Sequence, residues 1–201
     1  MIDFLAVLNY EHLDNGLFLT SFAKSLKKRE KRGLILHEDS EYTERIIQTG
    51  VMRDEATIRC YKDLNHRLVA LFADEGISTI GLNGFQKNLI LFDNESIDID
   101  FQLIKDLPNE PMILISSIGL SKNSNKPVPI SISSLAANLC EEFKVDKIDL
   151  FSIKQNSEIL IEDLPKSTTP KTTDKQFRDQ HIPKNFRLFD DEIRIQSPNS
   201  F

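Results

Sequence analysis

Short apolar runs that alternate with helix-forming segments constrain this chain more than any other feature. Four of these runs are long enough for a strand and occupy residues 2–8, 34–37, 111–120 and 147–153. Between them, apolar residues recur at three- and four-residue spacing, as on the inner face of an amphipathic helix. This alternation predicts an α/β protein, because strands that are apolar throughout are buried on both faces by helices.

Helical periodicity predicts four helices, at residues 17–31, 41–48, 54–75 and 133–143. Asp54 can accept amide hydrogens at the start of the longest helix, and Gly76 can close its end. Gly33 is expected to stop the first helix in the same way. Shorter strands are predicted at residues 77–84 and 88–92, and the acidic residues 93–100 are expected on the solvated face of an edge strand.

The composition changes after about residue 164. Residues 1–164 are predicted to form the α/β domain, and residues 165–201 a flexible linker and a short strand-like segment. Residues 165–185 are rich in threonine, lysine and proline, with too little apolar surface to offset the entropy of ordering them. Residues 186–196 alternate well enough for a strand that could pair with a sheet edge or a partner chain.

The charge balance argues against a generic nucleic-acid binder. The 201-residue chain has a net charge of -6 and a pI near 5.3, whereas phosphate backbones are held by clustered lysine and arginine. Basic residues do gather between Lys24 and Arg32. They are expected to stay solvated at the end of a helix, where cations complement the helix dipole.

Neither a membrane segment nor a disulfide is indicated. No apolar run reaches the ~18 residues of a membrane span, and the chain does not open with a charged and then apolar signal segment. Cys60 and Cys140 fall on the inner faces of predicted helices, which favours buried reduced thiols. The sequence therefore predicts a cytoplasmic protein that does not bind membranes.

The polar corner after the second strand, His37-Glu38-Asp39-Ser40, has several interpretations. It could be an acid–base cluster, or bind a hard cation through its carboxylates. An acidic helix start is the commoner explanation, because Asp39 or Ser40 can accept the unpaired amide hydrogens of the first turn. The four histidines of the chain are dispersed and lack metal-site spacing, so no metal is expected.

Two longer strings resemble the amino-acid kinase family, and within it acetylglutamate kinase most closely. Residues 65–84, NHRLVALFADEGISTIGLNG, are similar to the family's central helix and the strand after it. Residues 111–152 are similar to the strand that reaches the active site, the following hairpin, an Ala-Ala helix and the next strand. The resemblance covers roughly residues 2–160. It implies a three-layer α/β/α sandwich with a mainly parallel sheet.

The resemblance implies a phosphotransferase, but the phosphate-binding motifs are altered. Family members transfer the γ-phosphoryl group of ATP to a carboxylate, largely by positioning and by cationic and dipolar stabilisation. Where the family has Lys-x-Gly-Gly on the first strand, residues 7–10 are Val-Leu-Asn-Tyr. The family's Val-His-Gly-Gly-Gly loop keeps His37 and replaces the glycines with Glu38, Asp39 and Ser40. Each carboxylate opposes a phosphate charge by about 4 kcal/mol at ~4 Å in an effective dielectric near 20.

Other parts of the family's mechanism are also missing. Alignment on the Ala-Ala pair places Ser134 where the family has an aspartate that orients lysines. The family's Thr-Asp pair after the next strand becomes Ser152-Ile153, and fewer residues follow than the family's nucleotide half needs. A complete ATP site is therefore not expected, and the sequence predicts no cofactor.

The acceptor side of the resemblance is better preserved and supplies three candidate ligand-binding residues, His37, Arg53 and Asn65. Arg53 lies within one residue of the arginine that holds the substrate carboxylate in the family, and a guanidinium suits that bidentate contact. Asn65 and His37 match family positions on the central helix and in the loop. The plainer alternatives are a surface arginine beside Asp54 and an asparagine that is merely solvated or capping.

These features favour a catalytically impaired, acetylglutamate-kinase-like protein that acts as a binding, partner or regulatory subunit, linked to arginine biosynthesis by resemblance alone. It would form a homo-oligomer or bind a partner protein, and could take a small acidic metabolite. The alternative is a divergent active kinase that phosphorylates an N-acylglutamate-type carboxylate with ATP and Mg, completed by another chain. A third possible function is that of an interaction protein that shares only its fold with the family.

Overall fold

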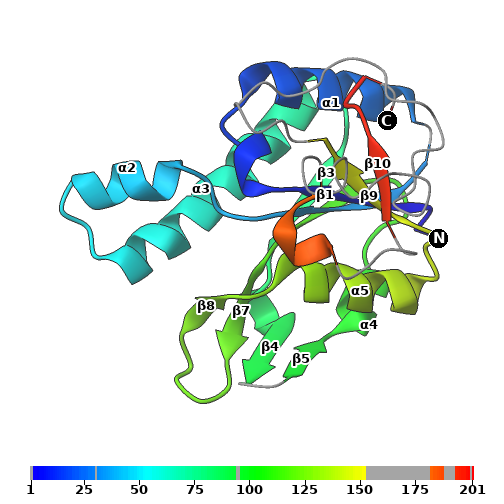
Figure 1. Cartoon of the computed structure of the whole chain (residues 1–201). Helices are drawn as coiled ribbons and strands as arrows, with labels where there is room; N and C mark the ends of the chain where they lie inside the picture. Colours follow the sequence, from blue (N-terminus) through cyan, green and yellow to red (C-terminus); the bar gives the residue numbers. More distant parts are fainter. Residues whose placement is uncertain (1, 30, 94–95, 153–181, 188–192, 200) are drawn as a thin grey trace.

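Six parallel strands form the central sheet (Figure 1). The computed structural model describes residues 2–29, 31–93, 96–152, 182–187, 193–199 and 201. The strands are β1 (Phe4–Leu8), β2 (Gly33–His37), β3 (Thr79–Asn83), β6 (Met112–Ser116), β9 (Ile148–Phe151) and β10 (Ile193–Gln196). Their order is β10-β9-β1-β2-β6-β3, and every neighbouring pair is parallel. Every residue of β1, β2 and β6 is buried, which explains their unbroken apolar character.

Helices cover both faces of this sheet (Figure 1). On one face, α1 (Gly16–Lys28) and α3 (Arg53–Asp74) pack through a cluster rich in phenylalanine. On the other, α4 (Phe101–Lys105) and α5 (Ile132–Phe143) join a mainly aliphatic cluster. The short α2 (Tyr42–Gln48) packs beside α3. Single 3-10 turns lie at Tyr10–His12, Gln86–Asn88 and Lys184–Phe186. The predicted three-layer α/β/α sandwich is confirmed.

A second, smaller sheet lies below the first in Figure 1. It has the order β5-β4-β7-β8 and consists of β4 (Ile90–Asp93), β5 (Ser96–Ile99), β7 (Ile118–Ser121) and β8 (Pro127–Pro129). The apolar run at residues 111–120 was predicted as one strand. It divides at Ser117, because its second part leaves the central sheet as β7. Asp98 is exposed on the edge strand β5, as predicted.

The helix ends agree only in part with those predicted from the sequence. Gly76 has φ +80° and closes α3, and the amide hydrogen of Ile77 returns to the carbonyl oxygen of Phe72 at 2.8 Å. The prediction for Gly33 was wrong, because α1 ends at Lys28 and Gly33 begins β2. A Cβ at Gly33 would lie 2.1 Å from the Phe4 ring, so this glycine makes room for an aromatic side chain. Asp54 was also misassigned, since Met52 precedes the helix as its N-cap.

The C-terminal strand belongs to the central sheet. Ile193 of β10 pairs in parallel with Ile148 of β9. Ile182 and Phe186 are buried in the aliphatic cluster, so Ile182, which was predicted to lie in the linker, packs against the domain. The rest of that linker, and the predicted boundary at residue 164, lie outside the described residues.

A buried carboxylate joins β10 to the core. Asp149 of β9 is fully buried, and its Oδ1 accepts hydrogen bonds from Arg194 Nε at 2.6 Å and from Gln196 Nε2. Its Oδ2 lies 3.7 Å from Nη2 of Arg29, an ion pair without a hydrogen bond. The Arg29 guanidinium also stacks over Phe4 and Phe201, 4.3 Å from each ring centroid. Arg29 is therefore not the solvated cation that the sequence predicted.

The side chains of Cys60 and Cys140 are buried as reduced thiols, as predicted. Among the described residues, none of the helices combines the length and apolar character that crossing a membrane requires.

Candidate functional site

Polar side chains gather where the strands of the central sheet end. In open α/β sheets, ligands bind outside the carboxyl ends of the parallel strands. At this edge lies a group of buried or half-buried residues, called the edge cluster here: Asn9, His12, His37, Glu38, Tyr61, Asn65, Asn83, Ser116 and Ser117.

Two predicted site residues, His37 and Asn65, contact each other in this cluster. His37 Nδ1 lies 2.8 Å from the carbonyl oxygen of Glu38, which can only accept, so Nδ1 carries the proton. His37 Nε2 must then accept the 3.2 Å hydrogen bond from Nδ2 of Asn65. Burial lowers the pKa of His37 to about 4. The imidazole is therefore neutral near pH 7, with its tautomer set by two fixed partners.

Gly81 of β3 explains how Asn65 fits beside the sheet. A Cβ at residue 81 would lie 2.2 Å from Oδ1 of Asn65 and 2.8 Å from Val69. The asparagine amide can approach β3 and donate to the carbonyl oxygen of Leu82, at 3.3 Å, only because residue 81 lacks a side chain. The plainer alternative of a solvated asparagine is therefore wrong, since Asn65 is 1% exposed.

Replacing Asn65 with alanine is expected to lower the free energy of unfolding by about 1–3 kcal/mol, because buried acceptors on His37 and Leu82 would lose their donor. Urea denaturation measures the change. Asn138→Ala is the matched control, because Asn138 donates to a carbonyl oxygen in its own helix but is exposed. Equal losses in the two variants would contradict this account of the edge cluster.

The serines of the cluster make structural hydrogen bonds. The hydroxyl of Ser116 donates to Oδ1 of Asn83 at 3.2 Å, and Ser117 Oγ lies 3.4 Å from the hydroxyl of Tyr61. Burial raises the pKa of Tyr61. An amide oxygen and a protonated phenol cannot take a proton from serine, so neither serine has the adjacent base that an activated nucleophile needs.

Glu38 brings a carboxylate to the junction between β1 and β2. Its Oε2 accepts the amide hydrogen of Tyr10, the second residue after β1, at 3.1 Å. Burial raises the pKa of Glu38 to about 7; the Tyr10 hydrogen bond opposes the shift, and Asp39 and Glu11 add to it. The described residues place no lysine or arginine within salt-bridge distance of this carboxylate. A carboxyl group of the protein therefore already occupies the backbone donor of Tyr10 at this junction.

The next residues of the corner cap α2. Ser40 Oγ accepts the amide hydrogen of Tyr42 at 3.1 Å, and Asp39 accepts from the hydroxyl of Thr43 at 3.3 Å. Ser40 therefore accepts a first-turn amide hydrogen, as the capping interpretation predicted, whereas Asp39 bonds only a side chain and the N-cap residue is Glu41. Within the described part of the chain, no three His, Cys, Asp or Glu side chains are grouped to hold a metal ion.

His12 is a second buried imidazole at the same edge. Its Nδ1 accepts the amide hydrogen of Asn9 at 3.2 Å, and its ring stacks on Phe18 with centroids 4.3 Å apart. Burial lowers the pKa of His12 to about 4. Like His37, this side chain is a neutral part of the core near pH 7.

Arg53, the third predicted site residue, does not join the cluster. Its guanidinium is exposed and forms a two-point contact with Glu44 of α2, at 2.8 and 3.4 Å. That contact also raises the pKa of Arg53. The arrangement matches the plainer alternative of a surface arginine beside acidic residues.

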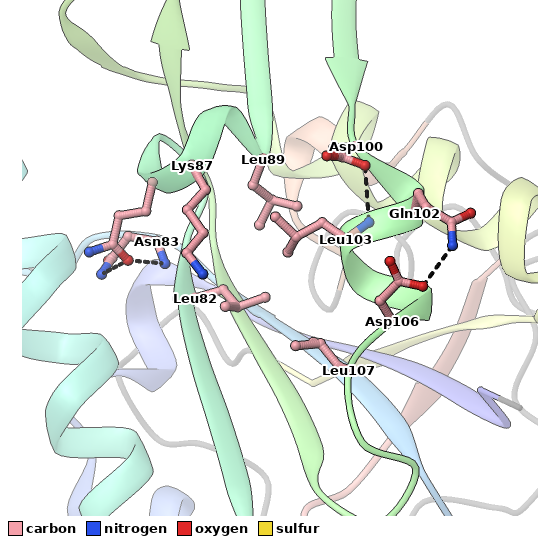
Figure 2. A pocket seen from close by; sticks show the side chains of 10 residues that line it. Leu82, Asn83, Lys87, Leu89, Asp100, Gln102, Leu103, Asp106 and Leu107 are labelled. Carbon is pink, nitrogen blue, oxygen red and sulfur yellow. Dashed lines mark hydrogen bonds between the residues drawn. The ribbon is translucent and has the colours of Figure 1, made fainter.

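A cleft of about 800 Å³ lies beside the edge cluster, between the end of β3 and α4 (Figure 2). Asn83 belongs to both the cluster and the cleft wall. Sequence reasoning missed this cleft, and it also missed Tyr61, Asn83 and Ser116. A usable signal was present for the last two, because each is a polar residue that ends an apolar strand.

Comparison with known proteins identifies the fold. The sequence matches no protein-family model and no curated protein. The structure is similar to isopentenyl phosphate kinase from T. acidophilum, with 12% identity and TM-score 0.66 over 99% of this chain and 92% of that one. It is also similar to N-acetylglutamate synthase from Neisseria gonorrhoeae, with 11% identity and TM-score 0.61 over 99% of this chain and 57% of that one. A third similar structure is aspartate kinase from Synechocystis, with 10% identity and TM-score 0.57 over 75% of this chain and 28% of that one. These likenesses establish the fold and no finer relationship. The chain has the amino-acid-kinase fold.

Proposed function

We propose that this chain is a non-catalytic relative of the amino-acid kinases, most like acetylglutamate kinase, that acts as a binding or partner subunit. The observation that carries the proposal is the contact between the Glu38 carboxylate and the Tyr10 amide. By resemblance, these residues stand in the two loops that hold phosphate in the family. Here the side chain of Glu38 takes the backbone donor that a phosphate oxygen would need.

Electrostatics at the junction support the proposal. Glu38 and Asp39 present carboxyl groups where the family has glycines. An ionised carboxylate ~4 Å from a phosphate charge repels it by about 4 kcal/mol in an effective dielectric near 20, and Glu38, whose pKa is raised to about 7, carries this charge increasingly as the pH rises through 7. The first strand has Leu5, Val7 and Leu8 at buried positions and contributes no lysine. Phosphoryl transfer depends on cations that stabilise the moving group, and the described part of this edge supplies none to Glu38.

Thermal-shift titration with ATP and magnesium tests the proposal. The wild-type chain is expected to show no saturable rise in melting temperature at millimolar nucleotide, because only a ligand that binds the native state stabilises it. Glu38→Ala frees the Tyr10 amide and removes a charge, so a phosphate-dependent shift should be larger in this variant. A clear saturable shift in the wild-type chain would overturn the proposal.

The alternative is a divergent active kinase, and the match that spans 92% of a T. acidophilum kinase favours it. This alternative predicts release of ADP from ATP and magnesium in the presence of N-acetylglutamate or isopentenyl phosphate. Coupled ADP detection on the chain, alone and with any co-purified protein, separates the two functions. No turnover in either preparation would exclude the alternative for these acceptors.

A further inference from the structure

The cleft between β3 and α4 has walls of opposite charge (Figure 2). Lys87, in the turn between β3 and β4, extends its ammonium group into the cleft from one side. Asp100 and Asp106, at the two ends of α4, lie on the other side. Leucine side chains, including Leu89 and Leu103, lie between the charged walls.

Lys87 is held in an unusual backbone conformation. Lys87 and Asn88 have φ values of 53° and 57°, in the left-handed region that side-chain-bearing residues rarely adopt. The described residues place no carboxylate within 4 Å of the Lys87 ammonium. The turn therefore keeps a strained lysine and leaves its charge available to a ligand, and backbone strain of this kind often accompanies function.

Each aspartate of the opposite wall has one carboxylate oxygen that can accept a hydrogen bond from a ligand. Oδ1 of Asp100 accepts the amide hydrogen of Leu103 at 3.0 Å, and Oδ1 of Asp106 accepts from Gln102 at 2.7 Å. These bonds fix both carboxylates on α4. Within the described part of the chain, Oδ2 of neither aspartate has a hydrogen-bond partner, so both can accept from a bound cation.

The lining charges select among ligand classes. With one ammonium and two carboxylates, the cleft carries a net negative charge, which opposes a phosphate ester or a dicarboxylate. A carboxylate beside Lys87 and an ammonium beside Asp106 would satisfy both walls through charge-assisted hydrogen bonds. The leucines between them would cover an apolar side chain.

We propose that this cleft binds an α-amino acid with an apolar side chain. The carboxylate of the ligand contacts Lys87, its ammonium contacts the α4 carboxylates, and its side chain packs on the leucines. This inference gives the proposed binding subunit a ligand class, and a site separate from the Glu38 junction. It favours a zwitterion over the small acidic metabolite expected from the sequence.

Isothermal titration of the full chain with L-leucine tests the inference. Leucine is expected to bind saturably. N-acetyl-L-leucine, which lacks the ammonium, and L-leucinamide, which lacks the carboxylate, should each bind about tenfold more weakly, as the loss of one charged contact predicts. N-acetylglutamate should not bind in the cleft.

Two glycine variants separate binding from folding. Lys87 and Lys144 are both exposed lysines whose φ is positive, but only Lys87 lines the cleft. Each is replaced with glycine. Both variants should match or exceed the wild-type melting temperature, because glycine adopts this conformation without strain. Only Lys87→Gly should weaken leucine binding, by about tenfold, and it should remove the preference for leucine over leucinamide. Asp106→Asn should reduce the preference for leucine over N-acetyl-leucine, because Asp100 remains on that wall.

The inference is overturned if leucine shows no saturable binding at millimolar concentration, if either derivative binds as tightly as leucine, or if Lys87→Gly leaves the affinity for leucine unchanged. A saturable response to ATP would instead contradict the proposed function and leave this inference intact. The failures of the two proposals are therefore distinguishable.

Discussion

Asp149→Ala is expected to lower the free energy of unfolding by about 3 kcal/mol, because removing one partner leaves charged groups in the core without compensation. Asp149 is fully buried between β1 and β10 and accepts hydrogen bonds from Arg194 and Gln196. Burial lowers the pKa of Arg29, and its attraction to Asp149 opposes that shift. Without the carboxylate, the guanidinium groups of Arg29 and Arg194 would repel each other with no anion between them.

Urea denaturation gives the magnitude of this loss, and hydrogen exchange gives its location. The amide hydrogens of Ile193 and Ile195 in β10 should lose protection before those of β2. Asp74→Ala is the control, because Asp74 is an exposed aspartate at the end of α3. If Asp149→Ala unfolded like the wild-type chain, the carboxylate would not hold β10 to the sheet.

Glu38→Gln is expected to make the protein about 2 kcal/mol more stable than wild type at pH 8, and the two proteins should become equally stable only below about pH 4.5. Burial raises the pKa of Glu38 from 4.5 to about 7, and a full shift of that size corresponds to about 3 kcal/mol. Partial solvent screening reduces this value. Glutamine keeps an oxygen for the Tyr10 amide hydrogen and carries no charge at any pH.

The direction follows from proton binding. The folded protein binds a proton at Glu38 more tightly than the unfolded chain does, so this group favours folding below about pH 4.5 and loses that contribution as pH rises through 7. His12 and His37 act in the opposite direction. Their pKa values are lowered to about 4, so protonation of the unfolded chain destabilises the fold as pH falls below 6.5.

Because these effects overlap, the useful quantity is the difference between wild type and Glu38→Gln across pH 5–8. Chemical denaturation at each pH supplies it, and both proteins share the histidine contribution. Glu41→Gln, at an exposed glutamate in the same corner, is the control and should track the wild-type chain. A difference that stayed constant with pH would mean that Glu38 is not buried as described.

The sequence predicted the layers of this fold well because burial on both faces leaves a direct pattern. Strands β1, β2 and β6 are buried along their whole length and almost entirely apolar, β9 is apolar except for Asp149, and α3 carries a helical stripe that ends at a positive-φ glycine. Such features are local, so they can be identified without knowing what packs against them.

Features that depend on distant partners were missed. Gly33 is a glycine because the ring of Phe4 lies over it, and Arg29 leaves the solvent because Asp149 and two aromatic rings surround it. In the edge cluster, His37 and Asn65 were identified through the family resemblance, but their mutual hydrogen bond depends on Gly81. Arg53 was identified from its position in the resemblance, but its guanidinium forms a hydrogen bond with Glu44 of a neighbouring helix.

The position of β1 in the sheet bears on how the chain reaches its native state. Leu5 pairs on one side with Leu34, which follows soon in the chain, and on the other with Ile148. During synthesis from the N-terminus, one edge of β1 therefore stays open until Ile148 has been made, more than a hundred residues after its first partner Leu34, and β10 can be added only after that. Closure over such a separation is slow, and an open apolar edge invites pairing with other chains. Folding of this protein is therefore expected to depend on protection of the nascent β1–β2 pair.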